Sequence, residues 1–231
     1  MLRFEDVKIR QGDFSLAADL SIAAGKHIAV IGPSGAGKST LLAALGGFLP
    51  LECGQIFWNE TDITHNRPGA RPMAMLFQDN NLFPHLSVFQ NVGLGLRPDL
   101  KLSQTDRQTV NAAIARVGLG GMEARKPAAL SGGQQSRAAL ARVLVQQMPL
   151  LLLDEPFAAL GPALRLEMLT LLRTLAQETH ATLLMVTHAP EDVSGIADEV
   201  IFVENGRAHA PAVADTLMEN PPPALRAYLG R

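Results

Sequence analysis

The sequence predicts an α/β fold in which a parallel sheet carries helices on both faces and a helical segment is inserted into the chain. Short apolar runs bounded by turns are typical of buried strands. Helical apolar patterns separate most of these runs, and strands that alternate with helices pair in parallel. Between residues 79 and 149, helical patterns recur without a convincing strand pattern, which predicts the insert. The buried strands are predicted at Ile28–Ile31, Met73–Phe77, Leu150–Asp154, Thr182–Val186 and Val200–Val203.

Composition supports a well-packed globular chain. Its 231 residues suit one large domain, or one domain with an insert. A hydrophobic fraction of 47% against 18% charged residues argues against disorder. The 20 Lys and Arg residues against 22 Asp and Glu residues leave a net charge of −2. This balance indicates no polyanion-binding surface, so we expect no nucleic-acid partner.

The cysteine count and the hydropathy of the sequence indicate the cellular compartment. Cys53 is the only cysteine, so an intrachain disulfide is impossible and a reducing cytoplasm is expected. Glu5 and Asp6 stand where a signal peptide needs an apolar run, so we expect no secretion. A membrane-spanning helix needs about 20 mostly apolar residues, and the best runs, 41–51 and 150–153, are shorter. We therefore expect a protein that docks, at most, on a membrane component.

The N-terminal third is predicted to be rich in strands. The run 4–9 indicates one strand, and clean alternation over 14–22 indicates a second that is buried on one face. Gly25 turns the chain into the strand at 28–31, which ends at a Gly-rich loop. A helical pattern begins at Lys38 and stops at the next pair of glycines.

The remaining elements follow from the same periodicities. Another strand is expected at Gln55–Trp58, and helices at Asp106–Val117 and Gln134–Gln147. We expect Pro221–Pro223 to begin a mobile or loosely packed tail. A core-facing helix is indicated by a stripe of period 3.6, formed by Leu164, Met168, Leu171, Leu172 and Leu175.

A phosphate-binding motif follows the strand at 28–31. The run GPSGAGKS satisfies G-x-x-x-x-G-K-[ST]. Glycines let successive backbone N–H groups point at phosphate oxygens, the lysine supplies a cation, and the following hydroxyl can reach Mg²⁺. A chance match in a chain of this length is roughly a 1% event, and this loop lies between a strand and a helix. We expect it to bind ATP with Mg²⁺ through Gly32, Pro33, Ser34, Gly35, Ala36, Gly37, Lys38, Ser39 and Thr40.

Two carboxylates end the apolar strand at 150–154. Ligands of α/β sheets bind at the carboxyl ends of the strands. There Asp154 would hold Mg²⁺, and Glu155 would orient or deprotonate the attacking water. By itself, such a strand end would be read as a pair of solvated acids. Beside a phosphate loop, we interpret the pair as the acidic residues of an ATPase.

The run LSGGQ at 130–134 is a Gly-rich turn that opens a helix. Read by itself it is a flexible N-cap, with Ser131 and the glycine amides free to hold an anion. It lies after the phosphate loop and some twenty residues before Asp154. This order of motifs resembles ABC ATPases, the ATP-binding subunits of ABC transporters, over nearly the whole chain.

The resemblance implies a fold. It is a P-loop NTPase (RecA-like) core of ABC ATPase type, with an N-terminal antiparallel β subdomain and an inserted α-helical subdomain. It implies a single nucleotide-binding domain over 1–231, with the core in 1–78 and 150–231. The helical subdomain would span 79–149 and carry the signature turn at 130–134.

The resemblance also implies a homodimer that encloses two ATP molecules. In it, the signature turn of one subunit closes on the γ-phosphate held by the other. Gln78 matches the family's Q-loop glutamine, which senses Mg²⁺ and the attacking water, and His188 matches its switch histidine. The catalytic residues would then be Glu155, His188 and Gln78. The residues that contact the metal would be Ser39, Gln78 and Asp154. The residues of the signature turn that contact ATP would be Ser131, Gly132, Gly133 and Gln134.

Two positions depart from the family pattern. The family usually shows Ser-Ala-Leu-Asp in the D-loop, whereas this chain has Ala-Ala-Leu-Gly at 158–161. At Gly161 the chain therefore lacks the carboxylate that makes the family's usual contact across the dimer. An aromatic residue upstream of the phosphate loop usually stacks on adenine, and Phe14 is the candidate. Its alternation with Leu16 and Leu20 is equally typical of a core position.

A lone ABC ATPase domain resembles the motor subunit of a bacterial importer. The implied partners are integral-membrane permease subunits and, indirectly, a periplasmic solute-binding protein. The implied place is the cytoplasmic face of the inner membrane, as a peripheral protein. Residues 75–88 match the region that receives the permease, where Leu82 and Phe83 are apolar in a polar connection. Only about 25 residues follow Gly206, too few for the regulatory domain of sugar-importer ATPases.

The cargo is suggested by resemblance only. The runs MLFQDNNLFPHLSVFQNVGLGL, EPFAALGPALRLEML and TLLMVTH are similar to the ATPase subunits of thiamine importers. Three alternatives stay open. The chain could serve an importer of another small solute, it could be a non-transport ABC ATPase, or it could be a binding module with a decayed ATPase.

Overall fold

The N-terminal strands form an antiparallel sheet. In the computed structural model, which describes residues 1–230, β1 (Leu2–Gln11) pairs with β2 (Phe14–Ile22) on one side and β4 (Cys53–Trp58) on the other. The short β5 (Thr61–Asp62) continues this sheet beyond β4. The alternation over 14–22 is confirmed, because Leu16, Ala18 and Leu20 face the core.

The strands that carry the predicted motifs pair in parallel, as the sequence predicted. The spatial order is β9 (Glu199–Glu204), β3 (His27–Ile31), β8 (Thr182–Val186), β7 (Leu150–Asp154) and β6 (Met73–Leu76). All their carboxyl ends therefore lie along the same edge. Two short strands complete the arrangement: β10 (Arg207–Ala208) joins β9 to β2, and β11 (Ala212–Val213) pairs with β9.

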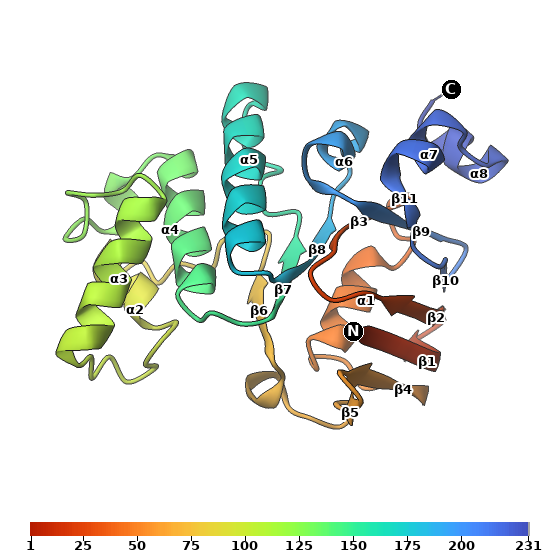
Figure 1. Cartoon of the computed structure of the whole chain (residues 1–231), viewed down its shortest axis with the longest axis horizontal. Helices are drawn as coiled ribbons and strands as arrows, with labels where there is room; N and C mark the ends of the chain where they lie inside the picture. Colours follow the sequence, from red (N-terminus) through yellow and green to blue (C-terminus); the bar gives the residue numbers. More distant parts are fainter. Residues whose placement is uncertain (231) are drawn as a thin grey trace.

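Helices cover both faces of the parallel strands (Figure 1). On one face, α1 (Lys38–Leu45) packs against alternate residues such as Leu150 and Leu152. On the other face, α5 (Pro162–Glu178) packs against Leu151 and Leu153. The period of two along each strand thus divides the core into two layers. Beside α5, α6 (Pro190–Ile196) covers the next strands.

The inserted segment contains α2 (Val88–Gly93), α3 (Gln104–Arg116) and α4 (Gly132–Leu144). Two single 3₁₀ turns, Pro68–Ala70 and Pro127–Ala129, precede β6 and α4. The helices share a core of their own, and α4 also packs against the sheet layer. The helices predicted at 106–117 and 134–147 begin two residues earlier than predicted, because Ser103 and Ser131 form capping boxes, and they end at Arg116 and Leu144. The sequence did not predict α2. None of the helices within residues 1–230 has the length and apolar character needed to cross a bilayer.

The expectation of a loose tail after Pro221 is wrong. After α7 (Ala214–Glu219), the chain forms α8 (Pro223–Tyr228) against β3 and β9. Leu225 is fully buried there. The ring centroids of Tyr228 and Phe202 are 6.2 Å apart. A short proline-led segment shows little periodicity, so its packing partner was invisible in the sequence.

A buried arginine holds the end of the helix that follows the phosphate loop. The guanidinium of Arg71 donates to the carbonyls of Ala44 at 3.0 Å and Leu45 at 2.5 Å. It also donates to the carbonyls of Thr64 and Asn66. These bonds satisfy carbonyls that the C-terminus of a helix leaves unpaired.

We therefore expect Arg71→Met to lower the free energy of unfolding by about 2–4 kcal/mol, because buried carbonyls would lose their donors. Urea denaturation followed by circular dichroism measures the change. Arg67→Met is the control: Arg67 is exposed, and its loss should stay within about 0.5 kcal/mol. Equal losses in the two variants would contradict the capping role.

Candidate active site

The loop between β3 and α1 adopts a conformation that only glycine tolerates at two places. At Gly32, φ is +150° and an added Cβ would lie 2.0 Å from the carbonyl oxygen of Val203. At Gly37, φ is +107° and a Cβ would lie 2.7 Å from the ring of Phe14. A residue with a Cβ at either position would have a strained backbone, and its Cβ would clash with the neighbouring atoms. The glycines are therefore required for the loop to pass this close to its neighbours.

Lys38 is buried at the start of α1 and points back into the loop. Its Nζ donates to the carbonyl oxygens of Gly32 at 2.8 Å and Pro33 at 2.9 Å. Burial lowers the pKa of Lys38, and the nearby carboxylates of Glu155 and Asp154 act in the opposite direction. The ammonium group is thus held where the loop, α1 and the end of β7 meet.

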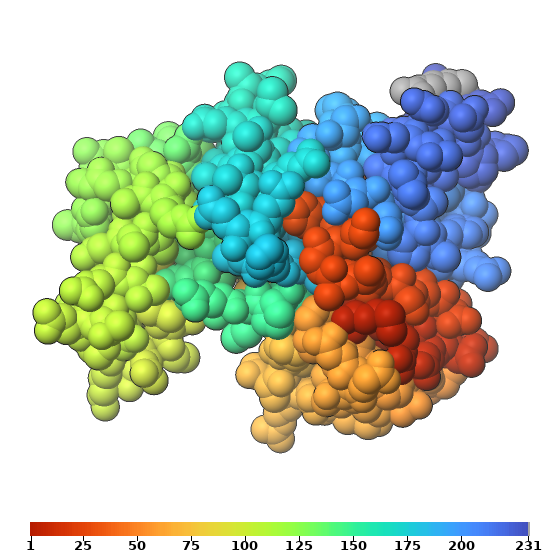
Figure 2. All heavy atoms as spheres, viewed as in Figure 1, coloured from red at the N-terminus to blue at the C-terminus, as the bar shows by residue number. Residues whose placement is uncertain are grey.

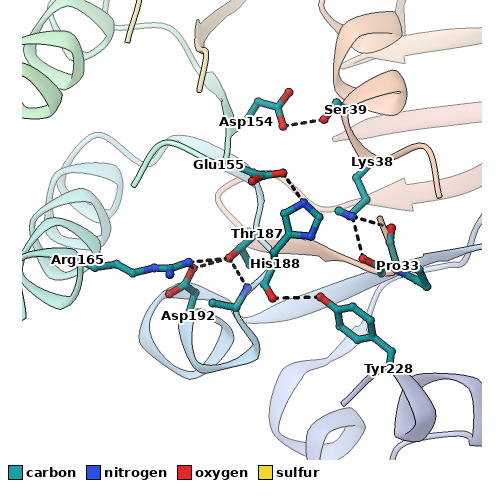
Figure 3. A network of polar contacts seen from close by, with 12 residues as sticks. Pro33, Lys38, Ser39, Asp154, Glu155, Arg165, Thr187, His188, Asp192 and Tyr228 are labelled. Carbon is teal, nitrogen blue, oxygen red and sulfur yellow. Dashed lines mark hydrogen bonds and ion pairs between the residues drawn. The ribbon is translucent and has the colours of Figure 1, made fainter. Parts of the chain in front are cut away.

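Ser39 and Asp154 lie next to each other although 115 positions separate them in the chain. The Oγ of Ser39 donates to Oδ1 of Asp154 at 3.0 Å (Figure 3). Burial raises the pKa of Asp154, and the Ser39 hydrogen bond acts against this rise. Hydroxyl and carboxylate oxygens are the ligands that Mg²⁺ prefers in proteins. The donor set is therefore chemically suited to a magnesium ion.

Glu155 and His188 form the second polar pair. Glu155 Oε1 lies 2.6 Å from His188 Nε2, and the side chain of Glu155 is the more buried of the two (Figure 3). The backbone of Glu155 is left-handed, with φ of +47°, and its N–H donates to the carbonyl of Val186 at 3.1 Å. Such a conformation is costly for a residue with a Cβ and is typical of functional sites. It turns the carboxylate toward the imidazole.

Lys38, Ser39, Glu155 and His188 line one cavity of about 550 Å³, and Asp154 is joined to it through its hydrogen bond with Ser39. Residues of the loop, of α1 and of the segments that follow β7 and β8 line this cavity. Two further lining residues, Gln11 and Phe14, come from the N-terminal strands, and Gln11 had no signal in the sequence. The lining residues are Gln11, Phe14, Ser34, Gly35, Gly37, Lys38, Ser39, Thr40, Glu155 and His188.

Comparison of the chain with known proteins identifies its family. A family profile described as ABC transporter matches residues 17–158. Thiamine import ATP-binding protein ThiQ of Ruegeria sp. is 63% identical over 230 residues, and the alignment covers 100% of both chains. The chain belongs to the ABC transporter ATP-binding proteins. The protein of the same name from Cereibacter sphaeroides is 56% identical, again over 100% of both chains.

Solved structures support the same assignment. The dimeric structure of a bacterial ABC transporter cassette has a TM-score of 0.80 and 26% identity to this chain. A dimeric post-hydrolysis state of that cassette, bound to ADP and Pi, gives the same values. Each comparison covers 93% of this chain and 99% of the other. The α/β core with its antiparallel and helical parts is therefore an ABC ATPase fold.

The signature turn of this ABC ATPase lies apart from the cavity. Within residues 1–230, neither 131–134 nor Gln78 lines it. Ser131 Oγ accepts the N–H of Gln134, whose Oε1 accepts the N–H of Ser131. Gly133 packs so closely on α5 that a Cβ would lie 2.3 Å from Leu164. Gln78 is exposed two residues after β6. The roles predicted for these residues remain predictions.

Residues that the sequence did not indicate hold the loop around His188. Thr187 accepts the N–H of Ala189 at 3.1 Å and donates to the buried carboxylate of Asp192. Arg165, in the first turn of α5, pairs with the same carboxylate at 2.5 Å. These residues line a second cavity of about 270 Å³ behind Glu155. Arg165 and Asp192 lie on separate helices, so no local sequence pattern predicts that they pair.

The remaining candidates have mixed positions. Phe14 is half-buried against the core, as one prediction had it, and it also lines the cavity; its stacking on adenine stays a prediction. Leu82 is half-buried between the sheet layer and the helical core. Phe83 is 47% exposed and meets the ring of His85 edge-on. Of the two apolar residues expected to dock, Phe83 is therefore the exposed one.

Proposed function

We propose that this chain is the ATP-hydrolysing motor of an importer for thiamine or its phosphates. The observation that carries the ATPase assignment is one cavity lined by Lys38, Ser39 and the Glu155–His188 pair, with Asp154 hydrogen-bonded to Ser39. The thiamine assignment is supported by full-length identity of 63% and 56% to thiamine import ATP-binding proteins.

In this proposal the triphosphate lies along the loop from Gly32 to Thr40. Backbone amides and the positive N-terminal end of α1 attract its oxygens. Lys38 exchanges its two carbonyl partners for oxygens of the β- and γ-phosphates, a stronger, charge-assisted interaction. Mg²⁺, held by Ser39, Asp154 and Gln78, would neutralise phosphate charge.

Hydrolysis then depends on Glu155. Its carboxylate accepts a proton from a water molecule as that water's oxygen attacks the γ-phosphorus and the bond to the bridging β–γ oxygen breaks. The products are ADP and inorganic phosphate. His188, already within hydrogen-bond distance of Glu155, orients the carboxylate and contacts the γ-phosphate.

A second copy of the chain completes the site. Ser131 and Gly132 are exposed at the N-terminus of α4, where backbone N–H groups attract anions. The solved relatives are dimers. We propose a homodimer in which 131–134 of each subunit meet the γ-phosphate held by the other. It would lie peripherally on the cytoplasmic face of the inner membrane, below permease subunits that receive cargo from a periplasmic binding protein.

The proposal is tested with the chain assembled with its permease in lipid vesicles. Thiamine-loaded binding protein should stimulate ATP hydrolysis and drive thiamine uptake. Stimulation by a different solute, with none by thiamine, would contradict the cargo. An assembled complex that does not hydrolyse ATP would contradict the motor function itself.

Phe83 gives a prediction about the permease contact. We expect Phe83→Glu to lower ATP-driven uptake at least about tenfold, because a charge would be desolvated at an apolar contact. ATP affinity should stay within about twofold of wild type. Val213→Glu, at a residue that is 57% exposed on β11, is the matched control. Unchanged uptake and unchanged co-purification with the permease would show that Phe83 is not part of the contact.

A further inference from the structure

The last helix of the described chain touches the candidate active site. The hydroxyl of Tyr228, at the end of α8, donates to the backbone carbonyl of His188 at 3.3 Å (Figure 3). Burial raises the pKa of the Tyr228 phenol, and the neighbouring backbone of Gly32 acts against this rise. Tyr228 therefore lies between the start of the phosphate loop and the loop that carries His188.

The position of this hydroxyl is set by the core. Leu225, one turn earlier in α8, is fully buried in the cluster that contains Ala29 and Ile31 of β3. The ring of Tyr228 packs against Phe202 of β9. The segment that ends in α8 lies at one end of the molecule (Figure 2), where α7 contacts β9 and α6. A tyrosine with a packed ring places its hydroxyl at small entropic cost.

Other bonds hold the residue next to His188: the N–H of Thr187 donates to the carbonyl of Val30 at 3.2 Å, and Arg165 donates to the hydroxyl oxygen of Thr187 at 3.3 Å. Thr187 and Asp192 tie the backbone of this loop to α6. The side chain of His188 is 44% exposed, so packing does little to fix it. The bond from Tyr228 to the carbonyl of His188 links this residue to β3 and β9 through the packed ring.

We infer that Tyr228 is a positioning residue of the ATPase reaction, because its hydroxyl holds the backbone of His188 so that the imidazole meets Glu155. The inference rests on the proposed function, in which that pair acts in hydrolysis. Ring packing by itself would be satisfied equally by phenylalanine. The hydroxyl, aimed at the carbonyl of His188, is the part that packing does not require.

The discriminating variant is therefore Tyr228→Phe, measured in the complex with the permease. It keeps the ring against Phe202 and removes one hydrogen bond. We expect kcat for ATP hydrolysis to fall about 3- to 10-fold, with KM for ATP within about twofold. Ala224→Ser, at an exposed position on the same helix, is the control and should leave both constants unchanged.

A double-mutant cycle separates positioning from general stability. His188→Gln keeps the backbone carbonyl but removes the imidazole, so adding Tyr228→Phe to it should leave kcat unchanged. The same 3- to 10-fold fall in that background, or no fall in the single variant, would overturn the inference. If His188→Gln by itself hydrolysed ATP at the wild-type rate, the proposed role of His188 would fail as well.

Discussion

Glu155→Gln should lower ATP hydrolysis by the assembled transporter about 10²- to 10⁴-fold, the usual contribution of a positioned general base. The amide has nearly the shape of the carboxylate but cannot accept a proton from water. The loop, Lys38 and the Ser39–Asp154 pair are untouched by the change. ATP should therefore stay bound, and the dimer should accumulate in its closed form.

Two measurements check this expectation. Steady-state phosphate release gives the loss of turnover, and gel filtration with Mg²⁺ and ATP reports the closed dimer. Glu191→Gln is the matched control, because Glu191 is an exposed carboxylate in the first turn of α6. Turnover by Glu155→Gln at the wild-type rate would exclude Glu155 as the general base.

Lys38→Ala should act at an earlier step. The ammonium group supplies the mobile positive charge of the loop, and hydrogen bonds to charged groups contribute about 1.5–3 kcal/mol each. We therefore expect the Kd for ATP to rise roughly 10- to 100-fold. Hydrolysis at ATP concentrations near the wild-type Kd should fall accordingly.

Titration calorimetry of ATP with Mg²⁺ measures this change directly. Lys26→Ala is the control. The side chain of Lys26 is solvent-exposed, and its Nζ lies 3.9 Å from a carboxylate oxygen of Glu199. Circular dichroism establishes that both variants are folded. A wild-type Kd for Lys38→Ala would place the phosphates elsewhere. The two predictions are thus distinguishable, since Glu155→Gln retains ATP and Lys38→Ala does not.

Several features could be read from neighbouring residues in the chain. The glycine and lysine spacing of the phosphate loop is contiguous, so the sequence showed it completely. The apolar strand before Asp154 and the capped turn at Ser131 were equally local, and the structure has both. Periodicity of two or 3.6 residues also identified most of the strands and helices. The order of these motifs placed the chain in its family.

Contacts between distant segments were decided only by the tertiary structure. Ser39 meets Asp154 because β3 and β7 flank β8 in the parallel sheet, an order that strand patterns do not contain. The packing of α8, which brings Tyr228 to His188, depends on a hydrophobic cluster from β3, β9 and α6. Local sequence determines which face of an element is apolar. The face of another element that packs against it is determined by close packing and by the burial of apolar surface over the whole chain.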